Sequence, residues 1–289
     1  ITAEDVQIIG RGGQDPVNNR PYVSGIFVTA EPKSPEVPST GNAGELTIDT
    51  TTMLVQDGAI VSASTNSNGN GGDLTINATD SLRVLGRGSD VISGTSSQFS
   101  EGKAGDLKIT TNTLLIENGG EISSGTSGAG NGGNLTVDAK TVQLAGKGDS
   151  GPSFNELSVR TSKNSTGNAG NLTINTDTLK IQNGSRVDAD TFGAGKGGNV
   201  SVNATDIEII GTSSNGNTPS SLSASAGKES TGDAGNVNIT TTDMLVRDGA
   251  FVAASTEGAG NGGDLNINAQ NLEIIGVGGE NPGNNNLPY

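Results

Sequence analysis

The chain has 289 residues, of which 46 are Gly and 2% are aromatic, and it contains no Cys, His or Trp. This composition excludes disulfides, cysteine-zinc sites and an ordinary core rich in aromatic side chains. A net charge of −15, from 16 Lys+Arg against 31 Asp+Glu, argues against a nucleic-acid partner. The sequence also lacks an apolar run long enough to span a membrane, so no membrane insertion is expected.

One motif recurs along the chain in two related forms. The first form (AGELTI and its variants) contains Gly44, Gly105, Gly170 and Gly235, and the second (GGDLTI and its variants) contains Gly72, Gly133, Gly198 and Gly263. Each second form follows its partner by 28 residues (72 − 44 = 28, and likewise for the other pairs). Self-similarity with a fixed period of a few tens of residues predicts a stacked solenoid.

Apolar residues alternate within each repeat in three successive runs. In the first repeat these runs are Leu46/Ile48, Met53/Val55 and the weaker Val61/Ala63. Alternation with period two predicts strands with one buried face, and the Gly, Asn and Asp clusters between them predict turns. In later repeats the third run is expected at Ile122/Ser124, Val159/Thr161 and Val187/Ala189.

These runs predict an all-β fold, a single-stranded parallel β-helix with three short strands per turn and about eight turns. The strong bias of parallel crossovers favours a right-handed coil. Residues 1–289 are expected to form one continuous array, with a partial turn at 1–43, full turns over 44–262 and a partial turn at 263–289. Because Asp5–Gly10 resembles Asn271–Gly276 and the chain begins at Ile1, we expect an internal piece of a longer protein.

The turns differ in length, and the additional residues are expected to form polar loops on one side of the column. These loops are placed after the second strand, at Gly86–Asp90, Gly146–Asn155 and Gly211–Ser220, with a Pro-rich excursion at Glu31–Ser39. Insertions in repeat proteins often lie on the binding face, but these differ from one another and are interpreted as solvated connections.

Glycine motifs of the dinucleotide-binding type occur three times, at 128–133, 193–198 and 258–263. A phosphate-binding loop of this type needs a helix after it, whereas here a strand is predicted to follow. We therefore interpret these glycines as tight turns between stacked strands. Calcium-binding β-rolls need tandem nine-residue units, and the chain has no such period.

Outward-facing positions are predicted to form columns along the solenoid. One column reads Thr47, Thr75, Lys108, Thr136, Thr173, Ser201, Asn238 and Asn266, and a second reads Leu54, Arg83, Leu115, Gln143, Lys180, Glu208, Leu245 and Glu273. The first resembles the threonine ladder of ice-binding solenoids but is interrupted by Lys108. The second suggests a solvated face. The rungs are not expected to build up the carboxylate cluster that a polysaccharide-cleaving β-helix needs. Asn77, Asn175, Asn203 and Asn268 are expected to stack through their amides. No catalytic, cofactor-binding or metal-binding residue is predicted, and no enzyme activity.

The repeat GNAGNLTI…DTLKIQNGSRVDADTFGAGKGGNVSVNATDIEIIG, from Gly167 onward, resembles the repetitive shafts of filamentous-haemagglutinin-like exoproteins, particularly those of cyanobacteria. The resemblance extends from Asp5 to Ile275 and concerns the style of the repeats. It implies a right-handed β-helix, secretion through an outer-membrane partner, and a role in adhesion, aggregation or extracellular structure. The secretion domain of the family is not found in this sequence.

Three hypotheses for function follow. The first is a non-catalytic structural or adhesive shaft of a secreted or cell-surface protein, whose partners are other cells, surface glycans or further copies of itself. The second is a carbohydrate-binding or carbohydrate-active β-helix. The third is a subunit of an extracellular filament assembled end to end, because uncapped strand edges favour pairing with other chains.

Overall fold

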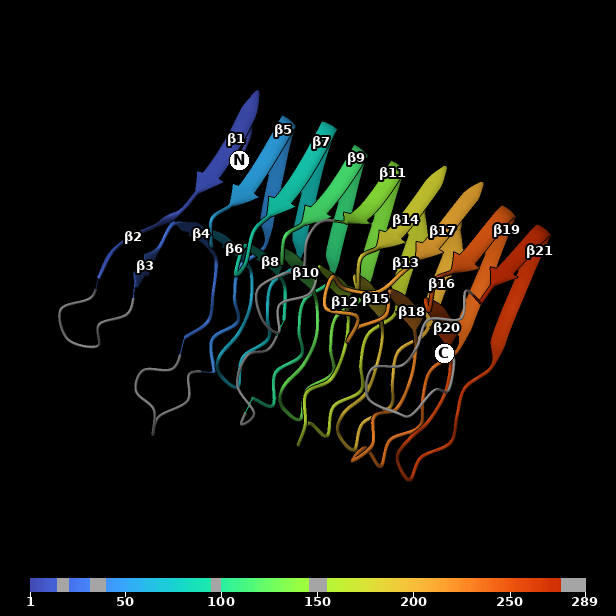
Figure 1. Ribbon diagram of the computed structural model, residues 1–289. Coiled ribbons are helices and arrows are strands. Elements are labelled where there is room, and N and C mark those ends of the chain that lie inside the picture. Colours follow the sequence, from blue (N-terminus) through green and yellow to red (C-terminus); the bar gives the residue numbers. More distant parts are fainter. Residues whose placement is uncertain (15–20, 32–39, 95–99, 146–154, 277–289) are drawn as a thin grey trace.

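The structure is a computed structural model that describes residues 1–14, 21–31, 40–94, 100–145 and 155–276 (Figure 1). Every secondary-structure element in these ranges is a strand, and most of the strands belong to two parallel sheets. The prediction of an all-β, parallel-stranded protein is therefore confirmed, and the arrangement is compatible with a solenoid. Among the strands of the described residues, β2 (Arg11–Gln14) and β3 (Pro21–Val23) form the one antiparallel pair, near the N-terminus.

Eleven strands form the larger sheet. They are β1 (Asp5–Ile9), β5 (Leu46–Gln56), β7 (Leu74–Leu85), β9 (Leu107–Glu117), β11 (Leu135–Ala145), β13 (Leu172–Asn175), β14 (Thr178–Gln182), β16 (Val200–Asn203), β17 (Asp206–Ile210), β19 (Val237–Arg247) and β21 (Leu265–Ile275). Figure 1 shows β1, β5, β7, β9 and β11 side by side in chain order, followed by β14, β17, β19 and β21, while β13 lies beside β16.

Eight strands of three residues each form the smaller sheet. They are β4 (Gly25–Phe27), β6 (Ile60–Ser62), β8 (Asp90–Ile92), β10 (Glu121–Ser123), β12 (Glu156–Ser158), β15 (Arg186–Asp188), β18 (Ser221–Ser223) and β20 (Phe251–Ala253). We use the word rung for one pass of the chain through both sheets.

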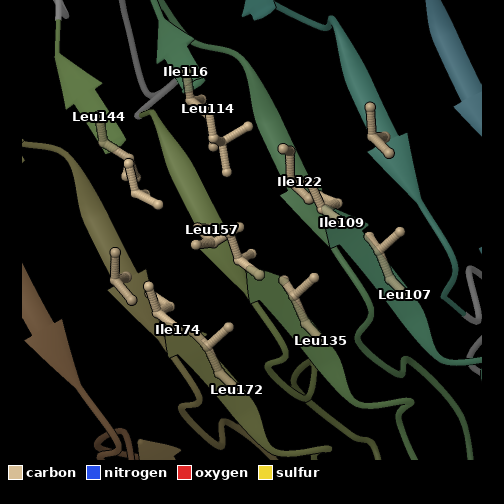
Figure 2. Close-up of a cluster of buried hydrophobic side chains, with 14 of the residues drawn as sticks. Leu107, Ile109, Leu114, Ile116, Ile122, Leu135, Leu144, Leu157, Leu172 and Ile174 are labelled. Atoms are coloured by element: carbon tan, nitrogen blue, oxygen red, sulfur yellow. The ribbon is translucent and has the colours of Figure 1, made fainter. Parts of the chain in front are cut away.

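Equivalent residues of successive rungs pair directly with one another. Leu74 pairs with Leu107, Leu107 with Leu135, and Leu135 with Leu172. Figure 2 shows Leu107, Leu135 and Leu172 projecting from neighbouring strands in the same direction. Stacked in this way, the inward Leu, Ile and Val residues form one continuous hydrophobic core, in which most side chains are fully buried. Since each rung buries its apolar face against its neighbours, stability is shared between rungs.

The first two expected strands are joined in most rungs. In β5 the buried positions are Leu46, Ile48 and Thr50, and then Met53 and Val55, so the alternation shifts by one residue in the middle of the strand. The larger sheet turns a corner there, and the register of the β5–β7 and β7–β9 pairs shifts at this point. The two strands are separate only as β13 and β14, and as β16 and β17. The sequence pattern predicted two separate strands in each rung. Among the described residues this break is found less often than expected, because most rungs carry both runs in one long strand.

The expected third run is wrong in one rung. Leu157 pairs with Ile122 and Val187, so the inward pair of that rung is Leu157/Val159 and not Val159/Thr161. Thr161 instead bridges Thr126 and Thr191. The alternation continues from Leu157 to Thr161, and a slide of two residues keeps the same face buried, so the pattern alone does not fix the register.

The predicted loop at Gly86–Asp90 is also wrong. Only residues 86–89 connect β7 to β8, and more of the additional length of this turn follows β8. The expected loop at Gly211–Ser220 is present, with an antiparallel bridge between Thr212 and Pro219. Residues 146–154 and 32–39, which carry most of the other two expected loops, lie outside the described residues.

Two columns of glycines line the corner that leads into each long strand. A Cβ atom on Gly170 would lie 1.9 Å from the carbonyl oxygen of Gly133, and one on Gly133 would lie 1.9 Å from that of Gly105. Three residues earlier, a Cβ on Gly167 would lie 2.0 Å from the oxygen of Gly130. Any side chain at these positions would push neighbouring rungs apart, so glycine is required for close backbone contact.

Asn and Asp side chains continue the hydrogen bonding beside these glycines. The backbone N–H of Asn171 donates to Oδ1 of Asn134 (3.0 Å), and that of Asn199 donates to Oδ1 of Asn171 (3.0 Å). A parallel column three residues earlier contains Asn131 and Asn168, joined in the same way at 3.0 Å. Short amide and carboxylate side chains thus accept hydrogen bonds from backbone N–H groups where the regular ladder is absent. This explains why Asn and Asp recur in the motif.

We predict that Gly170→Ala destabilises the protein by about 1–3 kcal/mol or more, because the added methyl group overlaps the backbone of the preceding rung. Gly12→Ala is the matched control, since a Cβ there would meet nothing within 4 Å, and should change stability by less than about 0.5 kcal/mol. Urea unfolding followed by circular dichroism measures both. Equal effects of the two substitutions would contradict the packing explanation.

Candidate functional site

The three glycine motifs contact neighbouring backbone. Gly130 and Gly133 of the first motif lie against the carbonyls of Gly102 and Gly105, and β11 follows directly. The glycines thus have a packing role at a strand-to-strand corner, as the sequence indicated. A phosphate-binding loop would instead present free backbone N–H groups at the start of a helix.

The predicted outward columns are present in the register of the larger sheet. Thr47 pairs with Thr75, Thr75 with Lys108, and Lys108 with Thr136, and the column continues through Asn266. The second column is likewise in register from Leu54 to Glu273. Lys108 interrupts the threonine row and the last positions are Asn, so this row lacks the uniform spacing of hydroxyls that ice binding needs.

The expected Asn column is formed mainly by mixed pairs. Asn77 Nδ2 donates to Asp49 Oδ1 (2.8 Å), and Asn175 Nδ2 donates to Asp138 Oδ1 (2.8 Å). A bond between two Asn side chains occurs at Asn203 and Asn175 (2.9 Å). Asn268, in register with Thr240, continues the column. These amides link successive rungs.

The structure brings together a charged cluster that the sequence did not predict. Glu156 pairs with Glu121 on one side and Arg186 on the other, and Ser158 pairs with Asp188. These positions flank the inward Leu157 and Val187, so their side chains lie on the outer face of the smaller sheet. The expectation that the rungs build no carboxylate cluster is therefore wrong. The signal was present as charged residues at equivalent third-strand positions, but the misplaced register obscured it.

Two carboxylates of this cluster are almost completely buried. Glu156 is 4% exposed and Asp188 is 2% exposed. Oε1 of Glu156 forms an ion pair with Nη1 of Arg160. Asp190 is stabilised by two hydrogen bonds. Its Oδ1 accepts one from Ser223 Oγ (3.0 Å) and one from the backbone N–H of Ser225 (2.6 Å). Oδ1 of Asp188 accepts no hydrogen bond from the residues that the structure describes.

Burial determines the protonation of these acids. Desolvation raises the pKa of Asp188 well above its ordinary value, and the nearby carboxylates of Glu156 and Asp190 raise it further. Desolvation also raises the pKa of Glu156, although Arg160 opposes the shift. The pKa of Asp190 is raised by burial against the hydrogen bonds from Ser225 and Ser223. The cluster therefore holds protons that exposed acids would release.

A hollow of about 150 Å³ adjoins the cluster, lined in part by Glu121, Ser123, Ser158 and Arg160. Ser158 approaches Glu156 closely enough to lower its pKa slightly, yet its Oγ makes no hydrogen bond of ordinary geometry. Acid catalysis uses carboxyl groups of raised pKa, but such groups must touch the substrate. Since Glu156 and Asp188 are covered, the arrangement supports proton uptake better than catalysis.

A larger hollow of about 700 Å³ lies along β14, β17, β19 and β21. Its walls include Lys180, Asp206, Glu208, Asp243 and Glu273. Several of these groups already have partners. Lys180 Nζ lies 3.0 Å from Glu208 Oε2. Asp243 Oδ1 accepts a hydrogen bond of 2.7 Å from Asn271 Nδ2. The walls thus form an acidic, solvent-facing groove across four strands.

Within the described ranges, no group of three or more acidic side chains is placed to hold a metal ion. The same residues include no helix of the length and hydrophobicity that a membrane crossing requires. Comparison with protein-family models, with curated proteins and with solved structures found no match to this chain.

We predict that Asp188→Asn stabilises the protein at pH 7 but not at pH 3. A carboxyl whose pKa is raised on folding contributes stability below its unfolded pKa, and this contribution is lost as the pH rises through the folded pKa. Asn resembles the protonated carboxyl and cannot ionise, so the substitution avoids that loss. The gain in unfolding free energy is about 1.4 kcal/mol for each pKa unit of upward shift. Chemical denaturation between pH 3 and pH 8 measures the difference.

The exposed Glu45→Gln serves as control and should leave the pH profile of stability unchanged. A destabilised Asp188→Asn protein at pH 7 would show that the ionised carboxylate is favourable in the folded state, against the assignment given above.

Proposed function

We propose that this chain is a structural shaft of a secreted or cell-surface adhesin-like exoprotein, of the filamentous-haemagglutinin-like type that its repeats resemble. The observation that carries the proposal is the unbroken ladder from β1 to β21, in which each rung repeats the contacts of the one before. Such a structure extends in one dimension and needs no active site to do so.

The shaft is proposed to be a right-handed parallel β-helix with three strand segments per turn and about eight turns. Two observations support this architecture. The corner inside the long strands divides each rung of the larger sheet into two faces, and the smaller sheet supplies a third. The parallel register between successive rungs agrees with one chain winding in a constant direction. At about 4.8 Å per rung, eight turns span roughly 40 Å.

The exterior fits a protein that works outside the cell among other molecules. Its outward columns are mostly Thr, Asn and charged residues, and the net charge of −15 favours solubility. Partners of the whole protein are proposed to be other cells, surface glycans or further copies, together with an outer-membrane protein for secretion. The shaft holds such contact regions away from the cell surface.

The acidic groove on β14, β17, β19 and β21 favours a second candidate function, binding or cleavage of a carbohydrate. Carboxylates such as Asp206 and Asp243 lie on neighbouring strands and can accept hydrogen bonds from sugar hydroxyls. Glycoside hydrolysis needs one carboxyl of raised pKa beside an ionised one. The carboxyls whose pKa burial raises, Glu156 and Asp188, are covered on the smaller sheet and cannot touch a sugar in the groove, so binding is favoured over cleavage.

A deletion tests the shaft proposal. Removal of residues 198–262 takes out two successive rungs and joins Gly197 to Gly263 in register. We expect a folded protein about 10 Å shorter, because each rung adds about 4.8 Å. Small-angle X-ray scattering measures the length and circular dichroism measures the β content.

Removal of residues 198–252 is the matched control, since it breaks the repeat and should disrupt the C-terminal rungs. A folded protein of unchanged length after the in-register deletion would exclude a linear stack.

A panel of neutral and acidic polysaccharides separates the two candidate functions. We expect no release of reducing ends by the chain, since the carboxyls whose pKa is raised by burial, Glu156 and Asp188, lie on the smaller sheet and not in the groove. A glycan array reports binding, and an Asp206→Asn/Asp243→Asn variant shows whether any binding uses the groove. Cleavage that this variant abolishes would replace the shaft proposal by an enzyme.

A further inference from the structure

The outer face of the smaller sheet carries a hollow that neither candidate function uses. It lies over β8, β10 and β12, in the middle of the column (Figure 1). Its volume of about 150 Å³ is several times what one water molecule needs, yet it is smaller than a typical site for a drug-sized ligand. The hollow therefore has the size for one small molecule, or for one unit of a larger one.

Glycine keeps the floor of the hollow open. Gly94 and Gly125 follow β8 and β10 at equivalent positions of successive rungs. A Cβ on Gly94 would lie 3.0 Å from the carbonyl oxygen of Gly125, and a Cβ on Gly125 would lie 2.4 Å from that of Arg160. Close contact between the rungs thus excludes side chains at these two positions, so the hollow follows from the packing of the backbone.

One hydroxyl at the edge of the hollow is buried and lacks a partner. Ser158 lines the hollow and is 1% exposed, and its Oγ forms no hydrogen bond of ordinary geometry with the residues that the structure describes. In the chain it lies between Glu156 and Arg160, whose side chains form an ion pair. Because this ion pair spans Ser158, the hollow is the side from which the hydroxyl can be reached. A buried hydroxyl without a partner costs free energy, and an occupant of the hollow would supply that partner.

Charges of both signs adjoin the hollow. Glu121 and Arg160 both line it, and Arg160 is paired with Glu156. Burial raises the pKa of Asp188, the neighbour of Ser158 in the next rung, which favours its neutral form. A free anion would meet the carboxylates of Glu121 and Glu156, and a free cation would meet the guanidinium of Arg160. A neutral ligand with several hydroxyls fits better, because each hydroxyl can donate to a carboxylate or accept from a guanidinium.

We propose that this hollow binds one neutral sugar residue through the hydroxyl of Ser158, the carboxylate of Glu121 and the guanidinium of Arg160. Ser123 and the two glycines form the floor against which the sugar ring lies. The site is on the smaller sheet, separate from the acidic groove on the larger one. It places a glycan contact on the column itself, and the argument for it does not require the shaft proposal.

Saturation-transfer NMR with the methyl glycosides of glucose, galactose, mannose and N-acetylglucosamine tests the site. We expect saturation to pass from the protein to at least one of them at millimolar concentration. Ser158→Ala should weaken this binding about two- to tenfold through the loss of one hydrogen bond. Ser123→Leu should abolish it by filling the hollow.

Two control variants should leave the binding unchanged. Ser62 occupies the same column as Ser123, but its Oγ donates to Ser64 Oγ (2.9 Å) and it does not line the hollow, so Ser62→Ala is the matched control. The Asp206→Asn/Asp243→Asn variant separates this site from the groove. Glycine, ethylamine and acetate serve as charged probes and should bind less well than the glycosides.

Thermal unfolding separates a binding role of Ser158 from a structural one. Ser158→Ala should not lower the unfolding midpoint, because no hydrogen bond within the described residues is lost. Circular dichroism shows whether Ser123→Leu is folded. A lower midpoint for Ser158→Ala would show that the hydroxyl already has a partner in the protein and would contradict the proposal.

Three results of the NMR experiment would overturn the proposal. They are the absence of glycoside binding by the wild-type chain, binding that neither Ser158→Ala nor Ser123→Leu weakens, and preferential binding of a charged probe. The length change expected from the in-register deletion does not depend on this site, so each of these results would leave the shaft proposal standing.

Discussion

Successive rungs come closest at the glycine corner. A Cβ atom added to Gly170, for example, would lie only 1.9 Å from the carbonyl oxygen of Gly133 in the preceding rung. This contact sets the distance between rungs at the value that strand pairing requires. The inward columns then stack at van der Waals distance, and the Asn and Asp columns reach the next backbone N–H. A residue larger than Gly at this corner would disturb the inward columns and the Asn and Asp columns together, because all of them depend on the same distance between rungs.

The sequence predicted those parts of the structure that are repeated. Leu74, Leu107 and Leu135 recur at fixed offsets, and their pairing follows from the period alone. The third strand varies between rungs, and turns of unequal length precede and follow it. At that strand the apolar alternation permits a slide of two residues, which is why Val159 was placed where Leu157 lies. The register of the third strand depends on how the whole rung packs, so the local alternation of apolar residues does not determine it.

The charged cluster was missed for a related reason. Glu156 comes from one rung and Arg186 and Asp188 from the next, so they meet only when the third strands are in the correct register. Their burial also depends on what covers the outer face of the smaller sheet, which apolar periodicity does not report. The cluster is a polar exception within a stack otherwise held by apolar and amide columns. Because burial raises the pKa of Glu156, Asp188 and Asp190, the stability of the rungs that carry them is expected to depend on pH.

The parallel ladder also has a consequence for how the chain folds. Many of its inter-rung hydrogen bonds join residues 28 or 37 positions apart. Each rung added to an existing stack therefore closes a loop of modest size, and the entropy lost in that step does not grow with the total length of the protein. Formation of the first pair of rungs is the slow event, after which growth proceeds by local zippering from either side. A stack of parallel rungs of this kind can be lengthened in evolution by duplicating rungs without a large penalty in folding rate.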